Sequence, residues 1–310
     1  MFQSLKGVPL AAVLQSFLNT LPSTFEQGLI YALMALGVMV TYLILDFPDL
    51  TVDGSFPLGG AVCSTLVIAG VSPVLALCVS AACGALAGLM TGLIHVKLKI
   101  RALFSGIIVM TALYSVNLRI TGGSSLISIP RDRVTLFRNN TLIEALPEGT
   151  GTLLIALALV ILIKVLLDLF LKTRFGLLLR AAGDNDRVVT ALARDKGNVK
   201  IIGLMIANSL VALAGGVLCQ QQRLFEISMG TGAIVLSLAS VIIGVNLFKR
   251  IERMGTTTKV ILGAILYKAC YSLAISLGLR PGDMKLVTAL LFLGILATRQ
   301  LKRKEAAGDA

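Results

Sequence analysis

Long apolar runs separated by short polar stretches constrain the fold of this chain more than any other feature. The runs lie at about 25–45, 57–70, 73–94, 102–118, 151–171, 201–219, 231–248, 256–276 and 284–298. A helix that crosses a bilayer needs roughly 20 predominantly apolar residues. Only 14% of the residues are charged, whereas a soluble domain carries about 25%. The sequence therefore excludes an ordinary soluble enzyme and predicts an all-α polytopic membrane protein with about 8–10 transmembrane helices.

Two stretches near the N-terminus are too short to cross a bilayer comfortably. The 57–70 run follows Pro57 and contains a Gly-Gly pair. It predicts a broken or re-entrant helix, which is tolerated in a membrane only where protein or a cavity buries the backbone. Residues 8–20 end before Pro22, and we expect residues 1–24 to form an N-terminal interfacial segment.

Three glycines repeat at intervals of four within one apolar run, at Gly84, Gly88 and Gly92. Small residues at this spacing let two helix backbones approach closely in a membrane. The pattern favours a helix contact within the chain over a contact between two copies.

The positive charges are concentrated in a few polar segments. Of the 28 Lys and Arg residues, 17 lie in 97–101, 172–200, 249–253 and 299–310. Alternation of the helices between them places all four segments on one side, and the positive-inside rule makes that side cytoplasmic. The 119–150 loop then faces outward and 299–310 forms a cytoplasmic tail. The net charge of +12 is thus a topology signal and predicts no nucleic-acid partner. The side of the N-terminus depends on whether the short runs cross, and it stays open.

The segment 172–200 is the longest predicted cytoplasmic connection between helices. Its polar sequence is interrupted by Gly183 and Gly197. Three of its residues are suited to cap a short helix, Asp184, Asn185 and Asp186. Spacing alone supports two interpretations equally: a docking helix for a cytoplasmic partner, or a solvated basic loop.

Polar residues at or near membrane depth mark a candidate translocation path. Residues 46–56 place three carboxylates between apolar runs. Charge at membrane depth usually faces a cavity or a partner, although a hydrated turn at the surface is the alternative. Elsewhere, polar side chains either line a path or bond across helices. The candidate path residues are Asp49, Thr51, Asp53, Ser55, Asn117, Asn208, Ser237 and Ser240.

Three lysines within the apolar runs differ in how easily their charge is accommodated. Lys164 lies four residues before Asp168, so the two can neutralise each other on one helix face. Lys259 can extend its side chain to the membrane surface. Lys268 lies nearer the middle of its run and is the charge that is hardest to explain structurally.

Several blocks of sequence resemble a known family. RAAGDND at 180–186, NVKII at 198–202 and ALAGGVL at 212–218 resemble the cytoplasmic-loop signature of bacterial ABC-importer permeases of the branched-chain amino-acid and ribose type. DLTVDGS at 49–55 and GLMTGLI at 88–94 resemble further family blocks in the same order. Within this group the chain is most similar to the tryptophan/tyrosine-type permeases.

The resemblance implies a transmembrane permease of the bacterial inner membrane that imports a small polar solute, an amino acid, with aromatic amino acids among the candidates. Its implied partners are a second permease copy, forming a homodimer or a heterodimer, a cytoplasmic ABC ATPase and an extracytoplasmic solute-binding protein. The implied ATPase-coupling residues are Arg180, Gly183, Asp184, Asn185, Asp186, Arg187, Arg194, Lys196 and Gly197.

The sequence offers no catalytic or cofactor-binding pattern of its own. It contains no G-x-x-x-x-G-K-[ST] motif, so the loop that cradles nucleotide phosphates is missing and ATP is expected on a partner subunit. One histidine, His95, and five cysteines without a Cys-x-x-Cys pair predict no metal site. The alternative to a permease subunit is an ion-coupled secondary transporter or channel that acts without an ATPase, although the sequence lacks a convincing internal repeat.

Overall fold

A computed structural model describes residues 10–140, 143, 150–184, 196–277, 286, 288–290 and 293–294, with backbone only at 10–14, 16, 184 and 196. Its elements are α1 (Leu10–Met39), the π-helix η2 (Val40–Ile44), α2 (Val52–Ile68), α3 (Pro73–Lys97), α4 (Ala102–Ile120), β1 (Leu126–Ser128), α6 (Gly151–Lys172), α7 (Arg174–Asp184), α9 (Lys196–Gln222), β2 (Leu224–Glu226), the 3₁₀ helix η3 (Ile227–Gly230), α10 (Ala233–Leu247) and α11 (Thr256–Ser276).

The helices confirm the predicted all-α polytopic class. Seven helical segments of the described chain are long and apolar enough to cross a membrane, and α2 is a shorter apolar helix. The last predicted run, 284–298, lies mainly outside the described residues. Strand structure in the described chain is limited to the β1–β2 pair. The apolar runs therefore mark the helices correctly, because each must satisfy its backbone hydrogen bonds internally.

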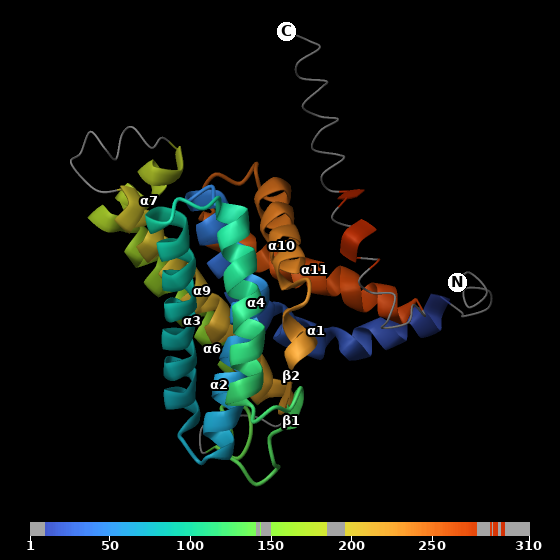
Figure 1. Cartoon of the computed structure of the whole chain (residues 1–310). Helices are drawn as coiled ribbons and strands as arrows, with labels where there is room; N and C mark the ends of the chain where they lie inside the picture. Colours follow the sequence, from blue (N-terminus) through green and yellow to red (C-terminus); the bar gives the residue numbers. More distant parts are fainter. Residues whose placement is uncertain are drawn as a thin grey trace.

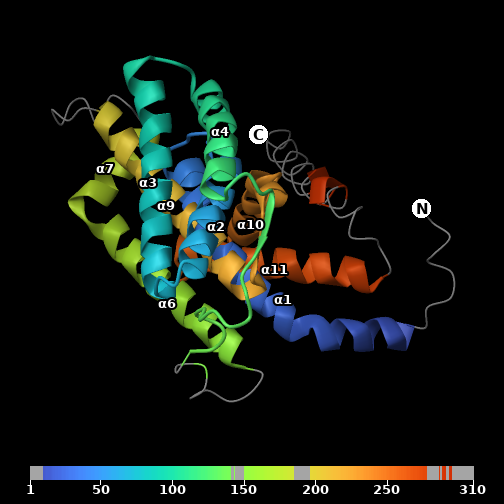
Figure 2. The same cartoon turned by 60° about the horizontal axis from the view of Figure 1, so that its bottom comes forward.

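The short helix α2 lies in the centre of the bundle, among α3, α4, α9 and α10 (Figure 1; Figure 2). Thirteen of its 17 residues are buried, so it faces protein rather than lipid. The expected break at Pro57 is wrong, because the helix continues through Pro57 and the Gly-Gly pair. The chain instead leaves helical structure before α2, at 45–51.

Close helix packing explains the glycines of the core. A Cβ at Gly59 of α2 would overlap the backbone of Ala212 in α9. The repeated glycines of α3 pack against α9 in the same way: Gly88 lies against Leu204 and Gly92 against Ile201. This confirms the interpretation of the α3 repeat as a contact within the chain.

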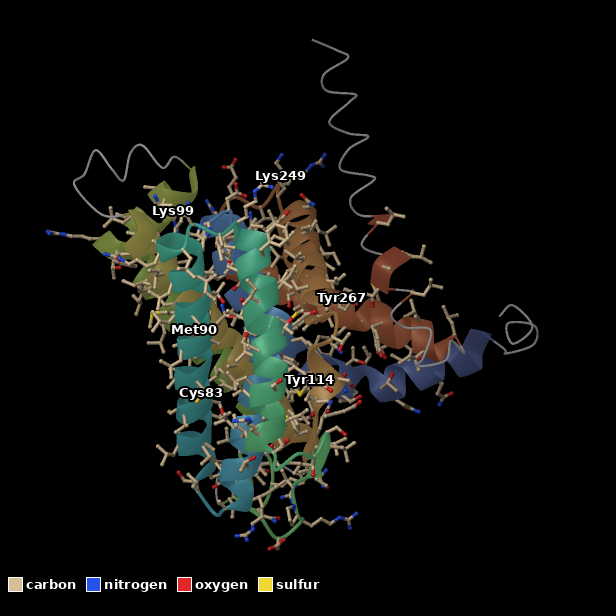
Figure 3. All side chains as sticks on the ribbon, in the orientation of Figure 1. Cys83, Met90, Lys99, Tyr114, Lys249 and Tyr267 are labelled. Atoms are coloured by element: carbon tan, nitrogen blue, oxygen red, sulfur yellow. The ribbon has the colours of Figure 1, made fainter. Side chains whose placement is uncertain are left out.

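Basic residues are more numerous at one end of the bundle than at the other, where Arg119, Arg131, Arg133 and Arg138 weaken the difference without reversing it. Lys99, between α3 and α4, and Lys249, after α10, lie at the same end (Figure 3). Helix α7 lies at that end too, and β1 and β2 lie at the opposite one (Figure 1). This arrangement agrees with the predicted clustering of 97–101, 172–200 and 249–253 on the cytoplasmic side. The tail at 299–310 lies outside the described residues.

The loop after α4, which the charge pattern predicts to be extracytoplasmic, is fastened to the end of α9. Strand β1 pairs antiparallel with β2, in the register Ile127↔Phe225. The Arg223 guanidinium donates hydrogen bonds to the carbonyls of Pro130 and Arg133, both at 2.8 Å. The buried Gln220 accepts a hydrogen bond from the Leu136 N–H at 2.9 Å, so the polar end of α9 holds this loop in place.

The first half of α1 and the last turns of α11 project from the bundle side by side (Figure 1; Figure 2). Pro22 lies inside α1, so residues 10–24 are continuous with the helix that follows rather than forming a separate short segment. The placement of 1–24 at the membrane interface stays a prediction, and residues 1–9 lie outside the described chain.

Candidate functional site

Helix α7 forms the described part of the predicted coupling segment. Leu179 and Ala182 are buried, whereas Arg180 is exposed, so the helix presents an apolar face to the bundle and a basic face outward. Gly183 lies directly on the Ile44 carbonyl, and a Cβ there would overlap it. The end of α7 is thereby in backbone contact with η2, the π-helical end of α1.

The remaining coupling residues are only partly described. Gly197 is buried near the start of α9. The backbone alone is described at Asp184 and Lys196. Four predicted residues lie outside the described chain: Asn185, Asp186, Arg187 and Arg194. Their role in coupling stays a prediction.

A basic cavity of about 660 Å³ lies beside α7, at the end of the bundle that is predicted to be cytoplasmic. Its charged lining residues are Lys164, Lys172, Arg180, Arg253 and Asp168. The Lys164 ammonium lies 2.9 Å from the Asp168 carboxylate, which confirms the predicted pair. The other oxygen of Asp168 accepts a hydrogen bond from Thr257 at 2.7 Å, so this carboxylate joins α6 to α11.

Four of the eight predicted path residues meet in one buried hydrogen-bond network. The two carboxylate oxygens of Asp49 accept from the Thr51 N–H at 2.9 Å and from Asn208 Nδ2 at 2.7 Å. The Ser55 hydroxyl donates to Asn208 Oδ1 at 2.7 Å. The Thr51 and Thr91 hydroxyls are 2.7 Å apart. These residues are at most 2% exposed, and the network joins the non-helical 45–51 segment to α2, α3 and α9.

Asp53 lies between Thr51 and Ser55 in the sequence but performs a different task. Its carboxylate accepts from the N–H groups of Ile234 at 2.8 Å and Gly232 at 3.2 Å. Gly232 has φ +83°, a conformation that glycine adopts without strain. Asp53 therefore supplies, from α2, the side-chain cap that the start of α10 would otherwise lack.

The other three predicted path residues are fully buried. Asn117 Nδ2 donates to the Gly54 carbonyl at 3.3 Å and so joins α4 to α2. Ser237 and Ser240 donate to carbonyls one turn earlier in α10, at 2.8 and 2.9 Å. A path role for all eight residues stays a prediction; their described partners are protein groups.

A second polar centre was only partly indicated by the sequence. Lys268 on α11 is buried, and its Nζ lies 3.8 Å from the ring centroid of Tyr31 and 4.9 Å from that of Tyr271. Gln27 Oε1 accepts from the same ammonium at 3.5 Å. The position of Lys268 in the middle of an apolar run and its i, i+3 spacing to Tyr271 were the available signals, whereas the sequence does not reveal that Tyr31 of α1 faces it.

The membrane helices, the basic end and the internal polar centres define an integral membrane transport protein. The chain matches the family described as branched-chain amino acid transport system, permease component, over residues 21–296, and it belongs to that family.

Individual relatives agree with this assignment. The chain is 42% identical over 279 residues to the tyrosine transport system permease protein of Clostridioides difficile, covering 90% of this chain and 91% of the relative. It is 26% identical over 227 residues to the ribose import permease protein RbsC of Escherichia coli K12, covering 73% and 69%. No solved structure matches significantly.

The comparisons support a permease component of an ABC-type import system over a self-contained ion-coupled transporter or channel. Together with the membrane-spanning helices, they place the chain in the inner membrane as a multi-pass protein. The resemblance noted from the cytoplasmic-loop motifs is thereby confirmed at the level of the family.

Proposed function

We propose that this chain is the transmembrane subunit of an importer for an amino acid, and that a separate cytoplasmic ATPase drives it. An extracytoplasmic binding protein delivers the solute. The observation that carries the proposal is the 42% identity to a tyrosine transport permease over nine tenths of the chain. The missing phosphate-binding loop agrees with ATP binding on the partner, and this chain itself binds no cofactor and catalyses no reaction.

Coupling to the ATPase runs through α7. Helix α7 lies at the end of the bundle opposite β1 and β2 (Figure 1), and its exposed Arg174 and Arg180 would face the ATPase there. Gly183 contacts the Ile44 carbonyl directly, so a displacement of α7 moves η2 and with it α1. Single π-helical turns frequently mark functional sites, which supports η2 as the element that receives this movement.

The working assembly contains a second copy of this permease, with one α7 on each of two ATPase subunits. ATP-driven closure of the ATPases rocks the helices between outward-facing and inward-facing states. The resemblance of the cytoplasmic-loop blocks at 180–186 and 198–202 to ABC permeases supports this arrangement. Its only other partner is the lipid bilayer, and nucleic acid has no part in it.

The transported solute is an amino acid, and L-tyrosine is the first compound to test. The test is uptake of radiolabelled L-tyrosine by proteoliposomes that hold the permease with its ATPase, with the binding protein supplied outside. We expect uptake that requires both ATP and the binding protein. Equal uptake by the permease alone, driven by an ion gradient without ATP, would instead establish the ion-coupled alternative.

A further inference from the structure

Lys268 is a buried cation within a membrane-spanning helix. The residue is 6% exposed and lies on α11, which is long and apolar enough to cross the membrane. Among the residues that the structure describes, no carboxylate forms an ion pair with it. An intramembrane charge is energetically costly and usually marks a functional site.

The two other lysines within the apolar runs, Lys164 and Lys259, need no ligand to explain them. Lys164 pairs with Asp168 at 2.9 Å. Lys259, on the same helix as Lys268, lies near the first turn of α11, at the cytoplasmic end, where its side chain can reach water. Within the described part of the chain, the Lys268 ammonium contacts the Gln27 amide oxygen at 3.5 Å and the faces of two tyrosine rings.

Two cavities meet at this ammonium. The first, of about 520 Å³, lies between α1 and α11 and is lined by hydroxyl and amide side chains, including Ser23 and Gln27. The second, also about 520 Å³, extends to β2, η3 and α10. Both are lined by Tyr31, Lys268 and Tyr271. Each volume falls in the range of roughly 300–1,000 Å³ that is typical of small-molecule sites.

The charge around the cavities is suited to an amino acid. Lys268 is the one charged residue among the described residues that line the first cavity. Glu226 is the one other charged residue along the described wall of the second. A carboxylate forms short charge-assisted hydrogen bonds with an ammonium, and tyrosine rings offer flat apolar faces for a side chain.

We propose that the Lys268 ammonium binds the carboxylate of the transported amino acid, and that Tyr31 and Tyr271 contact its side chain. The proposal rests on the amino-acid import proposed above and assigns the site within it. The second cavity is lined by β2 and η3 residues, which lie toward the end opposite α7 (Figure 1). The site therefore faces the side from which a binding protein would deliver the solute. Tyr267, which lines the same cavity, lies on α11 where this helix passes α10 (Figure 3).

The first experiment compares uptake by variants of the full transporter. Lys268→Met removes the charge and keeps an unbranched side chain, and Lys268→Arg keeps the charge. We expect Lys268→Met to lower L-tyrosine uptake about tenfold or more, since a charge-assisted hydrogen bond is lost, and Lys268→Arg to retain most of it. The matched control is Lys259→Met, which removes a lysine from the same helix and leaves uptake unchanged. Wild-type uptake by Lys268→Met would overturn the proposal while leaving the function proposed above intact.

The second experiment keeps Lys268 and needs no ATPase, so it also decides the case in which Lys268→Met fails to fold. A Ser23→Cys variant, made with Cys78→Ala and Cys270→Ala to remove the exposed thiols, reports access to the first cavity. It is placed in phosphatidylcholine nanodiscs, where no anionic lipid can occupy the site, and labelled with a charged methanethiosulfonate. We expect L-tyrosine to slow labelling and tyramine, which lacks the carboxylate, to have no effect.

Each result of the labelling experiment has one meaning. Protection by L-tyrosine alone supports a carboxylate site. Equal protection by tyramine, or no protection by L-tyrosine at any soluble concentration, overturns it. Failure of wild-type uptake in the first experiment, together with protection here, would refute the proposed transport function but not the binding site.

Discussion

At the residue scale, the carboxylate of Asp49 is bonded on both oxygens inside the protein, to Thr51 and Asn208. Asp49→Asn replaces one carboxylate oxygen by an NH2 group. That group then faces either the Thr51 N–H or Asn208 Nδ2, both of which are donors. We expect a loss of about 1–3 kcal/mol in the free energy of unfolding, because a buried polar group is left unsatisfied. The measurement is thermal unfolding in detergent. Asp46→Asn is the matched control: Asp46 is exposed, and asparagine tolerates its φ of +49°, so this change stays within about 0.5 kcal/mol. Equal stability of the two variants would show that the network does not hold the 45–51 segment.

Asp53 allows a capping role to be separated from a role in the path. Asp53→Ala removes the acceptor for the Gly232 and Ile234 N–H groups, and loss of a cap costs about 0.5–2 kcal/mol. We expect lower thermal stability for Asp53→Ala and an intermediate value for Asp53→Asn, which keeps one acceptor oxygen. Wild-type stability combined with a raised KM for uptake would assign Asp53 to the path instead.

At the element scale, the contact between α7 and η2 depends on one glycine. Gly183→Ala places a Cβ on the Ile44 carbonyl and pushes the two elements apart, at an overpacking cost of about 1–3 kcal/mol. We expect solute uptake to fall about tenfold or more while the ATPase still binds and hydrolyses ATP. Gly255→Ala is the control at the same end of the bundle, because a Cβ there meets only Thr257 Oγ1, at 3.7 Å. Normal uptake by Gly183→Ala would exclude this contact as the coupling route.

The helical elements could be predicted from the sequence because each apolar run must form its own hydrogen bonds in lipid. The irregular elements could not. The Gly-Gly pair after Pro57 predicted a broken helix, yet those glycines let α2 approach α9, and the break lies at 45–51. Glycine fits both a bend and a close contact, and only the position of the neighbouring helix decides between them.

The candidate site shows the same limit. Lys268 could be found from the sequence, because a charged residue in the middle of an apolar run is unusual. Tyr271, three residues further along α11, could also be expected on the same helix face, whereas Tyr31 comes from α1, more than 200 residues away in sequence. Asp49 and Asn208 meet through a similar long-range packing of helices. Polar residues in a membrane helix are equally suited to a path and to a bond between helices, and that choice depends on tertiary structure.

At the scale of the whole molecule, the excess of basic residues at one end of the bundle predicts how the protein lies in the membrane. Lys249 lies at the basic end and β1 at the other (Figure 1; Figure 3). Single cysteines at exposed sites test this orientation, again without Cys78 and Cys270: Lys249→Cys at the basic end and Ser124→Cys beside β1. A membrane-impermeant maleimide should label Ser124→Cys in right-side-out vesicles and Lys249→Cys only in inverted vesicles, because basic loops stay in the cytoplasm.

Labelling of both sites in detergent provides the control for thiol access. The reverse pattern would place α7 outside the cell and remove the basis for ATPase coupling. It would also turn the Lys268 cavities toward the cytoplasm, where no binding protein could reach them. Both proposals, the coupling contact at Gly183 and the solute site at Lys268, therefore depend on the orientation of the bundle. They share this premise although they lie on different helices and depend on different chemistry.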